Sequence, residues 1–287
     1  MLAFVTIVCL ISCGENKKNI KNDNKKNYYY YRDENGVLNK VEEEDVSKFK
    51  YSNELVKLAK NGNVKAMYGL ACCYRNGQGV NKNREEAFYW TKKAAEQGYA
   101  DAQLDLGTIL LESSNPQEAF KWMYKAAEQG NAKAQSNIGY CYEHGLGVQK
   151  NNKEAFCWTR KAAEQGYADA QWFLGDYYRK GIGVEINYNE AYRWYAKSAE
   201  QGSPEGQYAL YRCYLSGVGV QPDLDIAIQW LIKAAEQGDV ISRYELAIAY
   251  YNGVGLPQNK NKAVQILQNL AQEGNKDAVI ALQMISK

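Results

Sequence analysis

The sequence predicts an all-α fold built from tandem two-helix repeats, and three observations support this prediction. The tripeptide Glu-Gln-Gly recurs along the chain, with Gln-Glu-Gly as a degenerate last copy. The intervals between glycines at this place are 36, 32, 36, 36, 36 and 36 residues, for Gly62, Gly98, Gly130, Gly166, Gly202, Gly238 and Gly274. Each full interval contains two stretches whose apolar and small residues fall on one helical face. Self-similarity at this period is typical of helical repeat arrays.

Residues 1–13 are predicted to be a lipoprotein-type signal peptide. The apolar run from Leu2 to Ser12 is too short to span a bilayer as a helix but fits the core of an export signal. It ends in a segment that resembles the bacterial lipobox, which implies lipidation of Cys13. Gly14, in place of Asp, is compatible with the outer membrane. Cleavage as an ordinary signal peptide, with Cys13 incidental, is the alternative.

Residues 14–27 are predicted to be a disordered tether. They contain five Asn and five Lys and almost no apolar side chains, so burial cannot offset the entropy lost on ordering. The tether lies on an anionic lipid surface or serves as a solvated spacer.

A short hairpin is predicted within residues 28–50. Four consecutive tyrosines begin at Tyr28, and an Asn35-Gly36 turn separates them from Val37 and Leu38. A single helix is then expected over residues 51–60, at the start of a solenoid that covers residues 51–287.

Each repeat unit is predicted to contain two amphipathic helices. In the third unit, Ala134, Ile138 and Tyr142 lie on one face of the first helix, and Trp158 lies between alanines on the second. A tryptophan fixed at this place is interpreted as a core wedge, with a ligand platform as the alternative. The Gly-x-Gly loops follow a helix and are therefore interpreted as left-handed caps rather than phosphate-binding loops. The units are 63–98, 99–130, 131–166, 167–202, 203–238 and 239–274, with a capping helix at 275–287.

These units resemble the Sel-1-like repeat family, which is related to the tetratricopeptide repeat. The family pattern is roughly A-x-x-x-L-G-x-x-Y-x-x-G-x-G-V followed by A-x-x-W-x-x-K-A-A-E-x-G. Residues 134–166, 170–202 and 206–238 fit it well, whereas the second unit lacks the Gly-x-Gly loop. The resemblance covers about residues 60–287. It implies a right-handed αα solenoid of about six repeats that serves as an adaptor surface.

The sequence predicts no catalytic residues, no metal site and no cofactor. His144 is the single histidine, and metal-binding motifs are absent. Some cysteine-rich members of the family are described as β-lactamase-like, so a β-lactamase-like or peptidoglycan-processing envelope enzyme is the alternative function. No Ser-x-x-Lys motif supports it. Cys73, Cys141 and Cys213 lie two repeats apart, too far to form disulfides. The folded body is almost neutral, which argues against nucleic acid as a partner.

The tetratricopeptide relationship implies that a partner binds the wall formed by the first helices. Trp172 is singled out because it is the one tryptophan outside the repeated second-helix place. Many side chains on this wall are of the types that dominate interface energetics; packing between adjacent first helices is the alternative role for the tyrosines. The predicted binding residues are Tyr68, Tyr140, Trp172, Asp176, Arg179, Tyr208, Arg212 and Tyr244.

Together these observations predict a non-enzymatic scaffold that binds a protein or peptide. It is expected to be exported and lipid-anchored through Cys13 to a bacterial membrane, at the periplasmic or surface face of the outer membrane.

Overall fold

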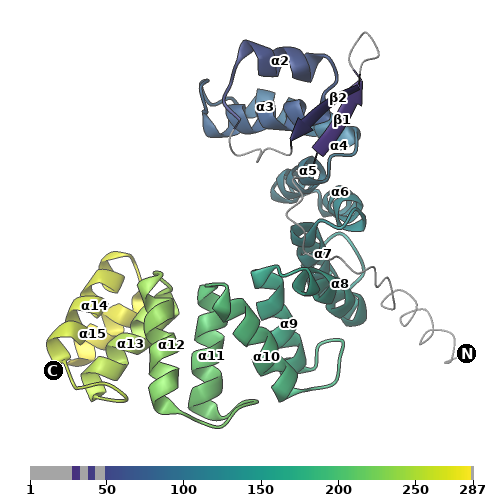
Figure 1. The fold of residues 1–287 in the computed structure, drawn as a ribbon. Helices are drawn as coiled ribbons and strands as arrows, with labels where there is room; N and C mark the ends of the chain where they lie inside the picture. The colour runs from purple at the N-terminus through teal and green to yellow at the C-terminus, as the bar shows by residue number, and fades with distance from the viewer. Residues whose placement is uncertain (1–27, 33–37, 43–48, 286–287) are drawn as a thin grey trace, which may run out of the picture. The chain divides into compact units, whose positions relative to one another are not determined.

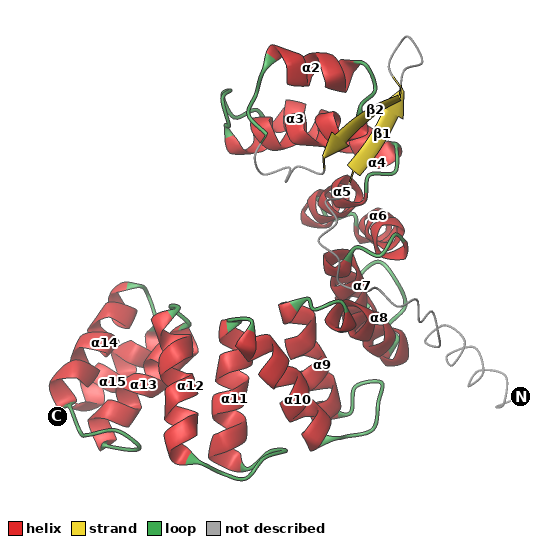
Figure 2. Cartoon of the chain, viewed as in Figure 1, coloured by secondary structure: helices red, strands yellow, loops and turns green. Residues whose placement is uncertain are grey.

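The computed structural model describes residues 28–32, 38–42 and 49–285. The predicted signal peptide, Cys13 and the Asn/Lys tether lie outside these residues. The described chain divides into two compact units, residues 1–106 and 107–287. It contains fourteen helices and two strands (Figures 1 and 2). None of these helices is both long and apolar enough to cross a lipid bilayer.

The first unit begins with the hairpin segment. Strands β1 (Tyr28–Arg32) and β2 (Leu38–Glu42) pair antiparallel, with Tyr30 opposite Lys40. The helices that follow are α2 (Asn53–Lys60), α3 (Val64–Asn76), α4 (Arg84–Glu96) and the first part of α5 (Ala100–Glu112).

The second unit continues the alternation of first and second helices. Its remaining helices are α6 (Pro116–Glu128), α7 (Ala132–His144), α8 (Asn152–Glu164), α9 (Ala168–Lys180), α10 (Tyr188–Glu200), α11 (Pro204–Ser216), α12 (Leu224–Glu236), α13 (Val240–Asn252), α14 (Lys260–Gln272) and α15 (Lys276–Ile285). The prediction of an all-α array of six two-helix repeats is confirmed.

Local sequence signals set the helix ends. The Asn131 side chain accepts a hydrogen bond from the backbone N–H of Ala134 at 2.9 Å and begins α7. Gly145 ends the same helix with a φ of +71°, a left-handed conformation that costs glycine little. The interpretation of the Gly-x-Gly loops as helix caps is therefore confirmed for their first glycine.

The second glycine of the loop has a different role, which sequence analysis missed. Gly147 lies against the start of α6 in the preceding repeat, where a Cβ atom would overlap the carbonyl oxygen of Pro116. Gly183 meets the carbonyl of Asn152 in the same way. This glycine therefore permits close packing between successive repeats.

In the second, third and fourth repeats, the two helices also approach closely at a glycine, Gly107, Gly139 or Gly175. A Cβ atom on Gly139 of α7 would overlap the Thr159 hydroxyl of α8 and lie 3.1 Å from the carbonyl oxygen of Ala155. Ala155 is fully buried, and Thr159 is 1% exposed. In these three repeats the glycine thus marks the place where the two helices touch.

A buried glutamine joins the first helix to its neighbours in the second to fifth repeats. Gln171 donates from Nε2 to the carbonyl oxygen of Ala163 at 3.2 Å and accepts from Gln201 at 2.6 Å. Gln201 belongs to the Glu-Gln-Gly tripeptide, whose recurrence is thereby explained. In the sixth repeat, Arg243 and Glu273 occupy the two places and form an ion pair at 2.7 Å.

The second-helix tryptophans are core residues to different degrees. Trp158 is 7% exposed, as expected for a core wedge, whereas Trp194 is only half-buried. A lysine three residues later covers each ring, with Nζ of Lys161 and Lys197 at 4.0 and 3.8 Å from the respective ring centroids. Cys141 is buried and unpaired, as expected.

Gly139→Ala should destabilise the protein by about 1–3 kcal/mol, because the added methyl overpacks the contact with Thr159. At an unobstructed helix position the same change stabilises by about 0.5–1 kcal/mol. The sign of the change in unfolding free energy therefore shows whether the contact is present. Urea unfolding of both proteins measures the difference. In a Thr159→Ala background, where the hydroxyl is absent, Gly139→Ala should reduce the free energy of unfolding by less than it does in the wild type. A Gly139→Ala protein as stable as the wild type would contradict this contact.

Candidate functional site

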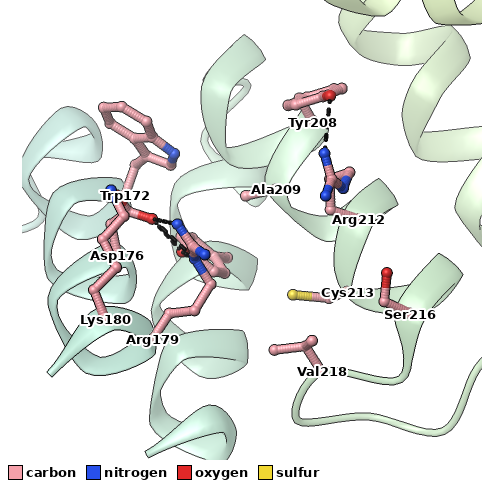
Figure 3. A pocket seen from close by; sticks show the side chains of 11 residues that line it. Trp172, Asp176, Arg179, Lys180, Tyr208, Ala209, Arg212, Cys213, Ser216 and Val218 are labelled. Carbon is pink, nitrogen blue, oxygen red and sulfur yellow. Dashed lines mark hydrogen bonds and ion pairs between the residues drawn. The ribbon is translucent and has the colours of Figure 1, made fainter. Parts of the chain in front are cut away.

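A pocket of about 420 Å³ opens between α9 and α11 in the second unit. Figure 3 shows side chains of α9 facing those of α11 across it. Five of the eight predicted binding residues line the pocket: Trp172, Asp176, Arg179, Tyr208 and Arg212.

Helical spacing explains why these residues gather. Trp172, Asp176 and Arg179 are four and three residues apart, so their side chains project from one face of α9. Tyr208 and Arg212, four residues apart, do the same on α11. Sequence reasoning missed six lining residues. They are Lys180, Tyr195, Ala209, Cys213, Ser216 and Val218.

A carboxylate organises the α9 side of the pocket. Asp176 Oδ1 accepts hydrogen bonds from Arg179 Nη2 at 2.7 Å and from the Tyr195 hydroxyl at 2.9 Å, and the other oxygen pairs with Lys180. Burial disfavours the charged carboxylate, but the hydrogen bonds from Lys180 and Arg179 outweigh it and lower the pKa of Asp176 below its ordinary value. Arg179 also donates from Nε to the Tyr195 hydroxyl at 3.2 Å. Its guanidinium is therefore held in place before any ligand arrives.

The α11 side carries a cation of a different kind. Arg212 reaches the Tyr208 hydroxyl with Nη1 at 3.5 Å, a long hydrogen bond. Tyr208 in turn donates to Glu245 of α13 at 2.8 Å. Among the residues that the structure describes, no carboxylate lies within ion-pair distance of Arg212. Three cations and one carboxylate line the pocket. Glu245, beyond Tyr208, offsets part of the charge of Arg212, so the pocket keeps a smaller excess of positive charge.

A comparison with the first unit shows why this pocket is open. There, Arg75 of α3 forms an ion pair with Asp105 of α5, and Tyr68 donates to the same carboxylate at 2.8 Å. In the repeat alignment, Arg179 takes the place of Arg75 and Ala209 that of Asp105. Because Ala209 offers no acceptor, Arg179 bonds to Asp176 of its own helix and to Tyr195 of α10 instead, and the space between α9 and α11 stays unfilled.

The remaining three predicted residues lie elsewhere. Tyr68 is 6% exposed and hydrogen-bonded to Asp105, so the structure supports the alternative role of packing between first helices rather than an open binding surface. Tyr140 is exposed and stacks on His144 with ring centroids 4.1 Å apart. Tyr244 is half-buried and lines a second pocket between α11 and α13.

Trp172 and Arg179 contribute to packing more than the repeat pattern indicates. The Trp172 ring packs against the buried cluster that includes Tyr195 and Leu210. Arg179, as described, bonds to Tyr195. Both side chains therefore support the fold as well as the pocket, which sequence analysis did not foresee because their contacts come from neighbouring helices.

The described residues contain no group of three or more His, Cys, Asp or Glu side chains that could hold a metal ion. His144 lies on the surface, where Nδ1 is 3.1 Å from the carbonyl oxygen of Tyr140. Cys213 is 2% exposed in the pocket wall, and burial raises the pKa of its thiol to about 11. It is therefore a poor nucleophile at neutral pH.

Comparisons with known proteins agree with this architecture. The Sel1 repeat family model matches residues 64–99, 100–131, 132–167, 168–203, 204–239 and 240–275. A Sel1 repeat protein from Oxalobacter formigenes is 34% identical over 80% of this chain and 68% of that one, with a TM-score of 0.71. A protective antigen from uropathogenic Escherichia coli is 34% identical over 79% of this chain and 50% of that one, with a TM-score of 0.68. No curated protein matches.

Asp176→Asn should reduce stability at neutral pH, and the reduction should vanish in acid. A carboxylate with a lowered native pKa contributes its full stabilisation above its ordinary value of 3.8, and the contribution is lost as the pH falls through the native pKa. Thermal melts of both proteins from about pH 7 to about pH 2.5 measure this difference. A gap that stays constant across this range would show that the Asp176 charge contributes nothing.

Proposed function

The chain belongs to the Sel1 repeat family, and on that premise we propose that it is a non-enzymatic scaffold that binds a segment of another protein at the α9–α11 pocket. Sel1 repeats generally mediate protein–protein interaction. One observation carries the proposal for this site. A preorganised pocket combines a half-buried Trp172, the tethered Arg179 and Arg212, which lacks an ion-pair partner in the described chain.

The composition of the pocket favours a macromolecular ligand. Trp, Tyr and Arg are the residue types enriched at the energetic centres of protein interfaces. Most of the pocket walls come from the facing sides of two first helices, and Arg179, Lys180 and Arg212 among them are exposed. An extended segment can lie across such helices while one of its side chains enters the pocket. No group of residues around it resembles a nucleophile with an adjacent base.

We also propose that the scaffold is displayed at the bacterial cell envelope. The support is the apolar run of residues 2–12 and its lipobox-like end at Cys13. A lipidated Cys13 followed by a polar tether would present the repeats away from the membrane surface. Two or more acyl chains anchor a protein stably, whereas one holds it only marginally.

Replacing Trp172 and Arg179 together by alanine should weaken partner binding by at least about 2 kcal/mol, or roughly 30-fold in Kd. A partner captured with the wild-type protein and identified would be titrated against both proteins by calorimetry. Because Trp172 and Arg179 also pack against Tyr195, a moderate loss of stability is expected as well.

The matched control for that variant is Arg193→Ala with Trp194→Ala. It removes the same two residue types from the second helix of the same repeat, where Trp194 is half-buried and the Arg193 side chain is 70% exposed. The control should bind normally. Equal losses in both variants, or none in either, would contradict the proposed site.

Cys13→Ser should release the protein from the membrane fraction or leave an unprocessed precursor, because the acyl chains are attached at this sulfur. Fractionation, mass spectrometry of the mature N-terminus and labelling with a fatty-acid analogue test this. A wild-type protein that is soluble and begins at another residue would remove the envelope-anchoring part of the proposal.

A further inference from the structure

Two pockets of equivalent position but different chemistry follow each other along the first-helix wall of the second unit. The second pocket, between α11 and α13, has a volume of about 270 Å³. Much of the lining of one pocket corresponds to the lining of the other moved by one repeat of 36 residues, as seen for Tyr208 and Tyr244, Arg212 and Ile248, Cys213 and Ala249, Ser216 and Asn252, and Val218 and Val254.

Starting from the proposed binding function, we infer that this wall reads an extended peptide segment with two features. An acidic side chain enters the α9–α11 pocket, and a bulky apolar side chain about three residues away enters the α11–α13 pocket. The ligand class is thus an internal acidic-and-apolar motif of another protein.

The charge of the first pocket favours a carboxylate. Asp176 already neutralises part of the charge of Arg179 and Lys180, whereas Arg212 has no ion-pair partner in the described chain. An incoming carboxylate can therefore pair with Arg212 without breaking an existing ion pair. Hydrogen bonds between charged partners are about twice as strong as neutral ones. Arg212 is exposed at the pocket mouth, so little solvation is lost before the bond forms.

The second pocket favours an apolar side chain for equally local reasons. Leu215 takes the place that Arg179 has in the first pocket, and Ile248 takes that of Arg212. Leu215, Leu224 and Val254 are among the exposed large apolar side chains and meet at this pocket. Its volume falls below the range of about 300–1,000 Å³ typical of small-molecule sites. It therefore suits one side chain rather than a whole ligand.

Glu245 prevents the two ligand features from exchanging places. It lines the second pocket, and its two oxygens accept hydrogen bonds from Tyr208 at 2.8 Å and Tyr211 at 2.7 Å. These hydrogen bonds hold the Glu245 carboxylate at the second pocket, where it repels an acidic side chain of the ligand. Such a repulsive element is a common source of specificity.

The spacing of the motif follows from the spacing of the helices. A pocket lies on each side of α11, so the two pockets are separated by at least about the 8–10 Å between packed helices. An extended chain advances about 3.3–3.6 Å per residue. About three residues therefore separate the acidic and apolar side chains.

Random peptides with blocked ends, displayed and selected on the immobilised full chain, test this inference. Enriched peptides should carry Asp or Glu about three residues from a large apolar residue. In fluorescence anisotropy, Arg212→Gln should weaken an enriched peptide about tenfold or more, and replacing the acid of the peptide by its amide should do the same. The amide peptide should bind Arg212→Gln no more weakly than it binds the wild-type protein, because both changes remove the same interaction.

A second variant places a carboxylate inside the pocket. Ala209→Asp restores the residue type found at the equivalent Asp105, so it should capture Arg179 or Arg212 and weaken the acidic peptide about tenfold or more. Ala209→Asn adds nearly the same volume without charge and is the matched control. Ile248→Ser should weaken peptides that carry the apolar residue but not peptides in which alanine replaces it.

The outcomes separate this inference from the proposed function. If the Trp172 and Arg179 double variant loses binding while Arg212→Gln and Ala209→Asp retain it, the acidic motif is wrong and the proposed site stands. If Arg193→Gln, on the second helix, weakens binding as much as Arg212→Gln, the attraction is nonspecific and the motif is overturned. If no peptide is enriched over a bare surface, or every wall variant binds normally, both ideas fail.

Discussion

Close contact at glycines is the constraint on which the second unit depends. Gly139 lets the two helices of its repeat touch at Thr159, and Gly147 lets the loop of that repeat touch the start of α6 at Pro116. One contact fixes helices within a repeat, and the other fixes successive repeats. Tyr211 and Ala247 replace the first glycine in the last two repeats, whereas the contact between repeats recurs at Gly183 and Gly219. This second contact therefore sets the spacing at which side chains of successive first helices meet. The pockets are consequences of that spacing.

The polar links between repeats show that an interaction can persist while its residues change. Gln171 and Gln201 form a neutral hydrogen bond, and Arg243 and Glu273 form an ion pair at the equivalent places of the last repeat. Glu273 of the degenerate Gln-Glu-Gly copy therefore still links to the first helix, because Arg243 replaces the glutamine as its partner. Arg243 is more exposed than the buried Gln171, which suits a charged pair at that place.

The period, the helix ends and the grouping of Trp172 with Asp176 and Arg179 could be predicted from the sequence, because each depends on local spacing along one helix. The roles of Tyr68 and Ala209 could not. Tyr68 donates a hydrogen bond to Asp105, which is 37 residues away. Ala209 matters because it cannot accept the hydrogen bonds that Asp105 accepts at the equivalent place. Both effects come from the adjacent repeat, and they become visible in the sequence only when the repeats are aligned and places on neighbouring first helices are compared in pairs.

The same pairwise comparison explains how one scaffold can carry different binding chemistry. Between α3 and α5, Arg75 forms an ion pair with Asp105 that links the two helices. At the α9–α11 step the acceptor is replaced by Ala209, and Asp176 on the same helix holds the guanidinium of Arg179 instead. Tethering reduces the entropy that binding must otherwise remove, but it also uses part of the charge of Arg179. A ligand carboxylate therefore depends chiefly on Arg212, whose hydrogen bond to Tyr208 is long and readily exchanged.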